Sequence, residues 1–280
     1  MASPKKDTAD DAKRLDDIIT RVGEIDLTVT PDPEFIDTTA TLSKVVGSLE
    51  GLPTEPPSLY FDLEGINLCR HGSVSILQIY VLPSHRTFLI DVHSLGDTCF
   101  SAAADNGCTL KTVLESSAIP KVFFDVRNDS DALYSHFGIK LAGVCDIQLM
   151  EIATRFSKKF VNGLSRCVET GALMTYKERA NWIQIKNKGV KLFAPEKGGT
   201  YDVFNQRPLP RDIANYCAQD VQVLPRLWSF YDEKLSSAWK KNILRATEDR
   251  IELSQSADYV GKGRHMALGP PSWQLCPPDM

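Results

Sequence analysis

Four acidic residues and one tyrosine, in three separate stretches of the 280-residue chain, have the types and spacing to bind divalent metal ions. Asp62 and Glu64 lie in the run Ser58-Leu-Tyr-Phe-Asp-Leu-Glu-Gly, whose apolar composition predicts a strand that ends at the glycine. Because alternate residues of a strand point to the same face, both carboxylates should project together. The sequence therefore predicts that Asp62 and Glu64 bind one ion jointly.

Tyr216 and Asp220 lie in a second stretch, Ile213-Ala-Asn-Tyr-Cys-Ala-Gln-Asp-Val-Gln-Val-Leu, which predicts a helix. A spacing of four residues puts both side chains one turn apart on the same helix face. An unpaired carboxylate among apolar neighbours is strongly destabilising, so Asp220 needs a metal ion, a basic side chain or solvent. We expect a metal ion there.

Such a set of side chains suits the hydrolysis of phosphodiester bonds. Carboxylate oxygens are the ligands that Mg²⁺ and Mn²⁺ prefer. Two such ions about 3.5 to 4 Å apart activate a water molecule and stabilise the charge on the attacking and leaving oxygens. A free phenol with a pKa of about 10 is a poor base at neutral pH, so a tyrosine hydroxyl in such a site is better suited to orient the water than to deprotonate it.

Three motifs of this chain resemble those of the DEDDy 3′-5′ exonucleases, the family that contains ribonuclease D and the Werner exonuclease domain. Each motif is weak alone, but the ordered set is specific and spans roughly residues 35–235. The motifs are Tyr60-Phe-Asp-Leu-Glu-Gly, then Lys121-Val-Phe-Phe-Asp-Val-Arg-Asn-Asp-Ser-Asp-Ala-Leu, and last Arg207-Pro-Leu-Pro-Arg-Asp-Ile-Ala-Asn-Tyr-Cys-Ala-Gln-Asp-Val.

The resemblance implies a catalytic site in which two Mg²⁺ or Mn²⁺ ions are held by four carboxylates, with Tyr216 as the fifth catalytic residue. The four implied ligands are Asp62, Glu64, Asp129 and Asp220, and Asp62 is expected to bridge both ions.

The second motif leaves its own ligand open, because Asp125, Asp129 and Asp131 crowd together. Asp129 best matches the ribonuclease D pattern, in which the aspartate follows a strand and opens a helix that it could also cap. Asp125 would suit a related proofreading pattern, and Asp131 would suit a first-turn acid favoured by the helix dipole. Some relatives of ribonuclease D carry histidine where Phe124 stands here.

The resemblance also implies the reaction, which is stepwise release of nucleoside 5′-monophosphates from a free 3′ end. RNA is slightly favoured over DNA, because the motifs resemble the ribonuclease D branch. The alternative is an exonuclease-like scaffold that binds nucleic acid or a protein partner without turnover. A scaffold has no physical need for four converging negative charges, so we favour the enzyme. A phosphohydrolase acting on small phosphates is weaker, since we find no Gly-rich phosphate loop.

Binding to nucleic acid must depend on local basic groups, because the formal net charge is −4. We expect phosphate contacts from Lys186, Lys188 and Lys191, at the start of a long basic and aromatic loop over residues 186–208. This loop is predicted to lie over the substrate groove; the alternative is an ordinary surface excursion. Two further candidates are Arg70 and the run Arg155-Phe-Ser-Lys-Lys.

The elements that must position these residues predict an α/β fold with a ribonuclease H-like mixed sheet flanked by helices. A three-strand antiparallel meander should be followed by parallel strands. Expected strands cover residues 58–64, 73–82, 87–92, 121–126 and 144–149, and expected helices cover 11–22, 39–49, 110–116, 130–137, 163–175 and 212–239.

The chain divides into a polar N-terminal extension over residues 1–33, an exonuclease domain over 34–240, and a helix end with a Gly/Pro-rich tail over 241–280. The two extensions are where a protein partner could act. We expect an intracellular protein, cytoplasmic or nuclear, with no membrane span, no signal peptide and seven dispersed, reduced cysteines.

Overall fold

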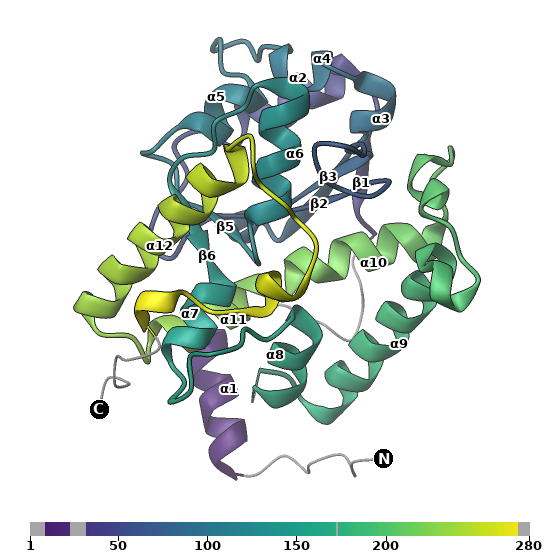
Figure 1. The fold of residues 1–280 in the computed structure, drawn as a ribbon. Helices are drawn as coiled ribbons and strands as arrows, with labels where there is room; N and C mark the ends of the chain where they lie inside the picture. Colours follow the sequence, from purple (N-terminus) through teal and green to yellow (C-terminus); the bar gives the residue numbers. More distant parts are fainter. Residues whose placement is uncertain (1–8, 23–31, 172, 274–280) are drawn as a thin grey trace.

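A six-stranded mixed sheet forms the centre of the protein (Figure 1). The computed structural model describes residues 9–22, 32–171 and 173–273. The strands follow the spatial order β1-β4-β3-β2-β5-β6. They are β1 (Glu34–Ile36), β2 (Leu59–Glu64), β3 (Ile76–Val81), β4 (Arg86–Ile90), β5 (Lys121–Phe123) and β6 (Val144–Asp146).

The predicted topology is confirmed. Strands β2, β3 and β4 form an antiparallel meander, and β5 and β6 extend it as parallel strands. Strand β1 pairs in parallel with β4 and has no counterpart in the prediction. At three residues it is too short to show a periodic pattern, so only its partner strand reveals it.

Helices cover both faces of this sheet (Figure 1). Helices α2, α5 and α6 pack on one face, and α10 and α11 pack on the other. The helices are α1 (Ala9–Val22), α2 (Thr39–Gly47), α3 (Val92–Leu95), α4 (Thr98–Ser101), α5 (Leu110–Glu115), α6 (Arg127–Phe137), α7 (Ile147–Ala153), α8 (Leu164–Thr170), α9 (Tyr176–Phe193), α10 (Arg211–Gln222), α11 (Leu224–Asp232) and α12 (Ser237–Gln255).

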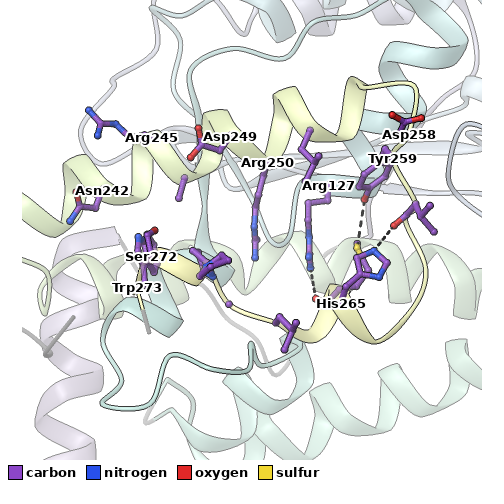
Figure 2. Close-up of a pocket in the computed structure, with 18 residues that line it drawn as sticks. Arg127, Asn242, Arg245, Asp249, Arg250, Asp258, Tyr259, His265, Ser272 and Trp273 are labelled. Carbon is purple, nitrogen blue, oxygen red and sulfur yellow. Dashed lines mark hydrogen bonds between the residues drawn. The ribbon is translucent and has the colours of Figure 1, made fainter. Parts of the chain in front are cut away.

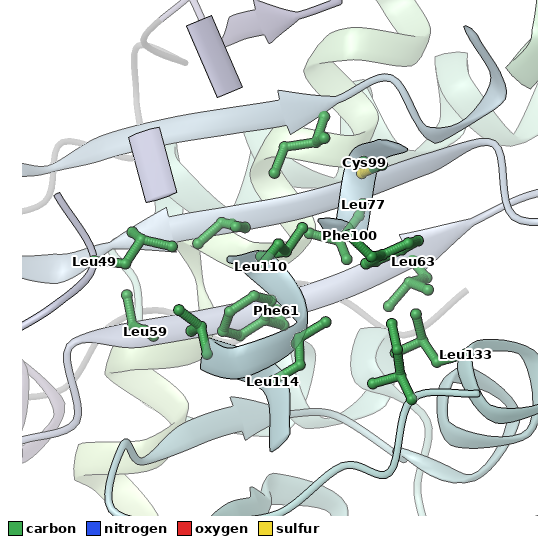
Figure 3. Packing of buried hydrophobic residues seen from close by; sticks show 14 of the residues in the cluster. Leu49, Leu59, Phe61, Leu63, Leu77, Cys99, Phe100, Leu110, Leu114 and Leu133 are labelled. Atoms are coloured by element: carbon green, nitrogen blue, oxygen red, sulfur yellow. The ribbon is translucent and has the colours of Figure 1, made fainter. Parts of the chain in front are cut away.

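Alternation along β2 divides its side chains between two environments. Leu59, Phe61 and Leu63 enter the core beneath α5 and α6 (Figure 3). There Phe61 stacks on Phe123 of β5, with ring centroids 5.5 Å apart. Asp62 and Glu64 therefore face the opposite side, toward α10. The same apolar residues that anchor the strand thus fix the direction of its carboxylates.

Two expected strands end earlier than predicted, and one side chain accounts for both. The Asp146 carboxylate accepts hydrogen bonds from the backbone N–H of Gln148 at 3.0 Å and of Asp125 at 2.9 Å. The first bond starts α7 directly after β6, because aspartate is a favoured N-cap. The second holds the turn between β5 and α6, where Asp125 has φ of 64°.

The expected helix over residues 212–239 is two helices, α10 and α11, followed by the start of α12. The break lies at Val223, and Pro225 stands in the first turn of α11. Proline is tolerated there because the first N–H groups of a helix have no partner within the helix.

The prediction of a loop over residues 186–208 is wrong for its first third. Residues 186–193 are the C-terminal half of α9. A capping box starts this helix, in which the Thr175 hydroxyl accepts from the backbone of Glu178 and the Glu178 carboxylate accepts from that of Thr175. Two short 3₁₀ turns, Pro195–Lys197 and Tyr201–Asn205, follow.

Both described extensions pack against the domain. Ile18 of α1 is fully buried in the core cluster around α11. The boundary expected at residue 240 falls inside α12, and the chain after α12 returns across α6, where Tyr259 Oη donates to Asn128 Oδ1 at 2.9 Å. Residues 256–273, which we call the C-terminal brace, therefore support the helix that carries Asp129.

None of the described helices is both long and apolar enough to cross a lipid bilayer. The six cysteines within the described ranges are free thiols, and Cys276 lies outside those ranges. A cavity of about 830 Å³ lies between α12 and the C-terminal brace, with Arg127 and Arg250 between its walls (Figure 2). It shares no lining residue with the carboxylate pocket described next.

Candidate active site

Three of the predicted carboxylates meet at one point. Each of Asp62, Glu64 and Asp220 offers an oxygen that lies within 4.8 Å of the oxygens of the other two. Strand β2 supplies the first two, and α10, which crosses β2, β3 and β4, supplies the third. The first and third motifs thus converge in the structure.

Tyr216 lies one turn before Asp220 and faces the same pocket, as the helical spacing predicted. This pocket has a volume of about 210 Å³. Its lining residues are Asp62, Glu64, Phe124, Leu164, Lys186, Tyr216, Asp220 and Leu224. The arrangement combines a carboxylate cluster with three apolar walls, a phenol and one ammonium group.

The second-motif acids are distinguished by their partners. Asp125 is paired with Arg127 at 2.5 Å, and Asp131 is paired with Arg70 at 2.6 Å. Asp129 is buried in the first turn of α6 and makes no ion pair with any residue that the structure describes. Of the three, only Asp129 has no ion-pair partner among the described residues, and it is neither a member of the cluster of Asp62, Glu64 and Asp220 nor a lining residue of their pocket.

Burial and mutual repulsion make the ionised form of these acids unfavourable without a counter-charge. Burial, followed by repulsion from Asp220, raises the pKa of Asp62 to about 7. Burial and the charge of Asp62 also raise the pKa of Glu64 and of Asp129. Burial raises the pKa of Asp220 as well, although Lys186 opposes that shift. A divalent cation would relieve this repulsion.

The donor set fits a metal ion. Oδ1 of Asp220 is buried and has no hydrogen-bond partner among the described residues. All the carboxylate donors are hard oxygens, which suit Mg²⁺ or Mn²⁺. A buried acceptor without a partner is costly unless a cation or a water satisfies it. The site therefore provides a ligand atom that the protein itself does not use.

Lys186 lies inside the site and not on a loop above it. Its ammonium forms an ion pair with Oδ2 of Asp220 and donates to Tyr216 Oη at 3.2 Å. Lys188 and Lys191 are exposed positions of the same helix. At 100° per residue, neither lies on the face of α9 that carries Lys186, so the three lysines do not form one basic strip.

Gly189 is a site determinant that the sequence reading missed. A Cβ on this residue would lie 2.6 Å from Cβ and Cγ of Tyr216, closer than packed atoms approach. Only glycine lets α9 come this near to α10, which in turn lets Lys186 reach Asp220. A lone glycine within a helical stretch could have indicated close packing, but among other glycines and prolines it suggested a loop.

The other basic groups proposed for phosphate are largely engaged within the protein. Arg70 binds Asp131 and donates to the carbonyls of Ser254 and Ser256, both at 2.8 Å. Lys158 is buried, with its ammonium over the Trp239 ring, and Arg155 is paired with a glutamate of α7 at 2.9 Å. These residues stabilise the fold around the site.

We expect Arg70→Met to lower the free energy of unfolding by about 2 to 4 kcal/mol, because it leaves the buried Asp131 without its partner. The matched control is Arg86→Met, which breaks an exposed pair with Glu34 and should cost less than about 1 kcal/mol. Urea unfolding checks both values. Equal losses of stability in the two variants would contradict a stabilising role for the pair of Arg70 and Asp131.

The stabilisation of the protein by Mg²⁺ should grow as the pH rises from 5 to 8. The raised pKa values mean that the metal-free folded state keeps protons that the unfolded chain releases near pH 4. The contribution of Asp62 to the free energy of unfolding therefore falls between about pH 4 and pH 7, and those of Glu64 and Asp129 change in the same direction. Metal binding requires deprotonated ligands, so the melting-temperature difference between Mg²⁺ and EDTA should be small at pH 5 and large at pH 8. An equal melting-temperature difference at pH 5 and at pH 8 would contradict this prediction.

Comparisons with known proteins agree with this geometry. A family model described as 3′-5′ exonuclease matches residues 33–236. The piRNA biogenesis protein EXD1 of Mus musculus is 37% identical over 107 residues, which are 38% of this chain and 17% of that protein. The EXD1 protein of Homo sapiens is 37% identical over a segment that covers 38% of this chain and 19% of that protein. The matched segment is thus less than a fifth of either curated relative.

Solved structures share the fold. Trypanosoma brucei RNase D in complex with RNA U12 superimposes with a TM-score of 0.68 at 22% identity, covering 89% of this chain and 79% of that one. Escherichia coli RNase D, an exoribonuclease involved in structured RNA processing, gives a TM-score of 0.53 at 18% identity, covering 81% and 52%. At these identities the likeness establishes a common architecture.

Proposed function

The chain belongs to the DEDDy-type 3′-5′ exonuclease family, and we propose that it hydrolyses nucleic acid from the 3′ end to release nucleoside 5′-monophosphates. The observation that carries this proposal is the convergence of Asp62, Glu64 and Asp220 within 4.8 Å, beside Tyr216. A cluster of one buried and two half-buried acids has no stabilising role in the fold, because desolvation and repulsion both oppose its ionisation.

This family generally depends on divalent metal ions. We assign Asp62, Glu64, Asp129 and Asp220 as the carboxylates that would hold two Mg²⁺ or Mn²⁺ ions. When bound, such ions lower the pKa of a water molecule and stabilise the charge on the phosphate oxygens. Two observations support this assignment: among the described residues, Oδ1 of Asp220 has no hydrogen-bond partner and Asp129 has no ion-pair partner.

The remaining pocket residues position the reactants. Burial raises the pKa of Tyr216 well above its usual range, so the phenol stays neutral and orients the attacking water by hydrogen bonding. Phe124, Leu164 and Leu224 form apolar walls that limit access of bulk water to the scissile bond. In this proposal, residues 34–240 carry the catalytic residues, and residues 241–273, which are the rest of α12 and the C-terminal brace, support them.

We favour single-stranded RNA with a free 3′ end as the substrate. Two relatives support RNA, since one was solved with RNA U12 and another is named for piRNA biogenesis. Lys188 and Lys191 are exposed and can meet phosphates of the strand, whereas Lys186 is engaged in the site. A cytoplasmic or nuclear location, and a protein partner at the terminal extensions, belong to the same proposal.

The decisive experiment compares matched RNA and DNA oligonucleotides, labelled at the 5′ or the 3′ end, in Mg²⁺ or Mn²⁺ titrations. A stepwise ladder from the 5′-labelled strand, with immediate loss of the 3′ label as a mononucleotide, is the expected result. Tight binding without shortening in either metal would instead indicate the nucleic-acid-binding scaffold.

A further inference from the structure

The two oxygens of Asp220 have different surroundings. Oδ2 pairs with the Lys186 ammonium, whereas Oδ1 is buried without a hydrogen-bond partner among the described residues. Asp220 itself is 3% exposed, so water has little access to either oxygen. Only Oδ1 is therefore available to a metal ion while Lys186 stays in place.

Lys186 is held in this position by its neighbours. Its ammonium lies 3.2 Å from Tyr216 Oη, 4.3 Å from the centroid of the Tyr216 ring and 5.7 Å from that of Trp182. The side chain is 18% exposed, and the close approach at Gly189 brings its helix against α10. This is a built contact and not the chance position of a surface lysine.

The Lys186 ammonium lies beside the whole carboxylate cluster. It pairs with Asp220, which offers an oxygen within 4.8 Å of oxygens of Asp62 and Glu64, and all four residues line the same pocket. A positive charge beside these three carboxylates must repel a divalent cation that enters the same pocket.

We propose that Lys186 is a resident cation that competes with divalent metal ions for Asp220, restricts that carboxylate to one ligand oxygen and weakens metal binding before substrate arrives. This inference rests on the proposed function. The incoming phosphate of the substrate offers the ammonium an alternative partner, so substrate binding would free Asp220 for the metal. Lys186 then acts as a positioning residue that delays full metal loading until nucleic acid is present.

The test is a calorimetric titration of Mn²⁺ into the full chain without nucleic acid. Lys186→Met should bind Mn²⁺ at least about tenfold more tightly than the unmodified protein, because a charge a few Å from the ion is removed. Lys186→Gln keeps a hydrogen-bond donor toward Asp220, removes the same charge and should behave likewise. It replaces the methionine variant if that variant does not fold.

Two controls separate the possible failures. Lys177→Met removes an exposed lysine of the same helix and should leave the affinity within about twofold, since exposed charges are strongly screened. Asp220→Asn should weaken Mn²⁺ binding. Unchanged or weaker affinity in both Lys186 variants, with Asp220→Asn still weakened, would overturn the competing-cation proposal alone. Unchanged affinity in Asp220→Asn would overturn the metal site itself.

Discussion

Asp62→Asn should reduce metal-dependent cleavage by at least about 10³-fold, since a metal ion in such a site supplies several kcal/mol of transition-state stabilisation. The same change should stabilise the metal-free protein at pH 8 by about 1 to 2 kcal/mol, because asparagine removes a carboxylate whose ionisation the folded state opposes. The gain should largely vanish near pH 4, where the carboxyl group is protonated in the folded state and about half protonated in the unfolded chain.

End-labelled oligonucleotides measure the first effect, and urea unfolding in EDTA at pH 4 and pH 8 measures the second. The matched control is Asp131→Asn, an acid of the second motif that is paired with Arg70. It should lower the free energy of unfolding, the opposite sign, because it breaks a buried ion pair. Substantial cleavage by Asp62→Asn would remove Asp62 from the catalytic set.

Gly189→Ala should lower kcat by about 10- to 100-fold without weakening metal binding, because displacement of a positioning group by about 1 Å is costly, whereas a shift of α9 would only withdraw Lys186 from Asp220. The new Cβ would lie 2.6 Å from two atoms of the Tyr216 side chain, which must move. The free energy of unfolding should fall by about 1 to 2 kcal/mol, since overpacking outweighs the roughly 1 kcal/mol that alanine gains in a helix.

Single-turnover cleavage, a metal titration and thermal unfolding separate these effects. Gly47→Ala is the control, because its Cβ would meet only the Cβ of Ala104, at 3.3 Å. That variant should stay within about 1 kcal/mol of the unmodified protein and keep full activity. Full activity in Gly189→Ala would show that the position of Tyr216 does not limit the reaction.

Local backbone geometry explains which parts of the site could be read from the sequence alone. The alternation of β2 puts Asp62 and Glu64 on one face, and the helical repeat puts Tyr216 beside Asp220. Both relations depend only on neighbours within a few residues. The antiparallel meander could be predicted because strands that follow one another in the chain usually pair, and residues 82–85 alone join β3 to β4.

Tertiary structure decided what depends on partners far away in the chain. The partners of Asp125 and Asp131 illustrate this. Arg70 pairs with Asp131, and Arg250 lies near Asp125, which its local neighbour Arg127 also binds.

The sequence predicted that Lys186 lies in a loop. In the structure, the packing of α9 on α10 places it beside Asp220, 34 residues later in the chain. The sequence by itself determined the chemistry and the local geometry of the ligands. Which acid is left free, and which cation lies beside the site, followed only from side-chain contacts between segments that the fold brings together.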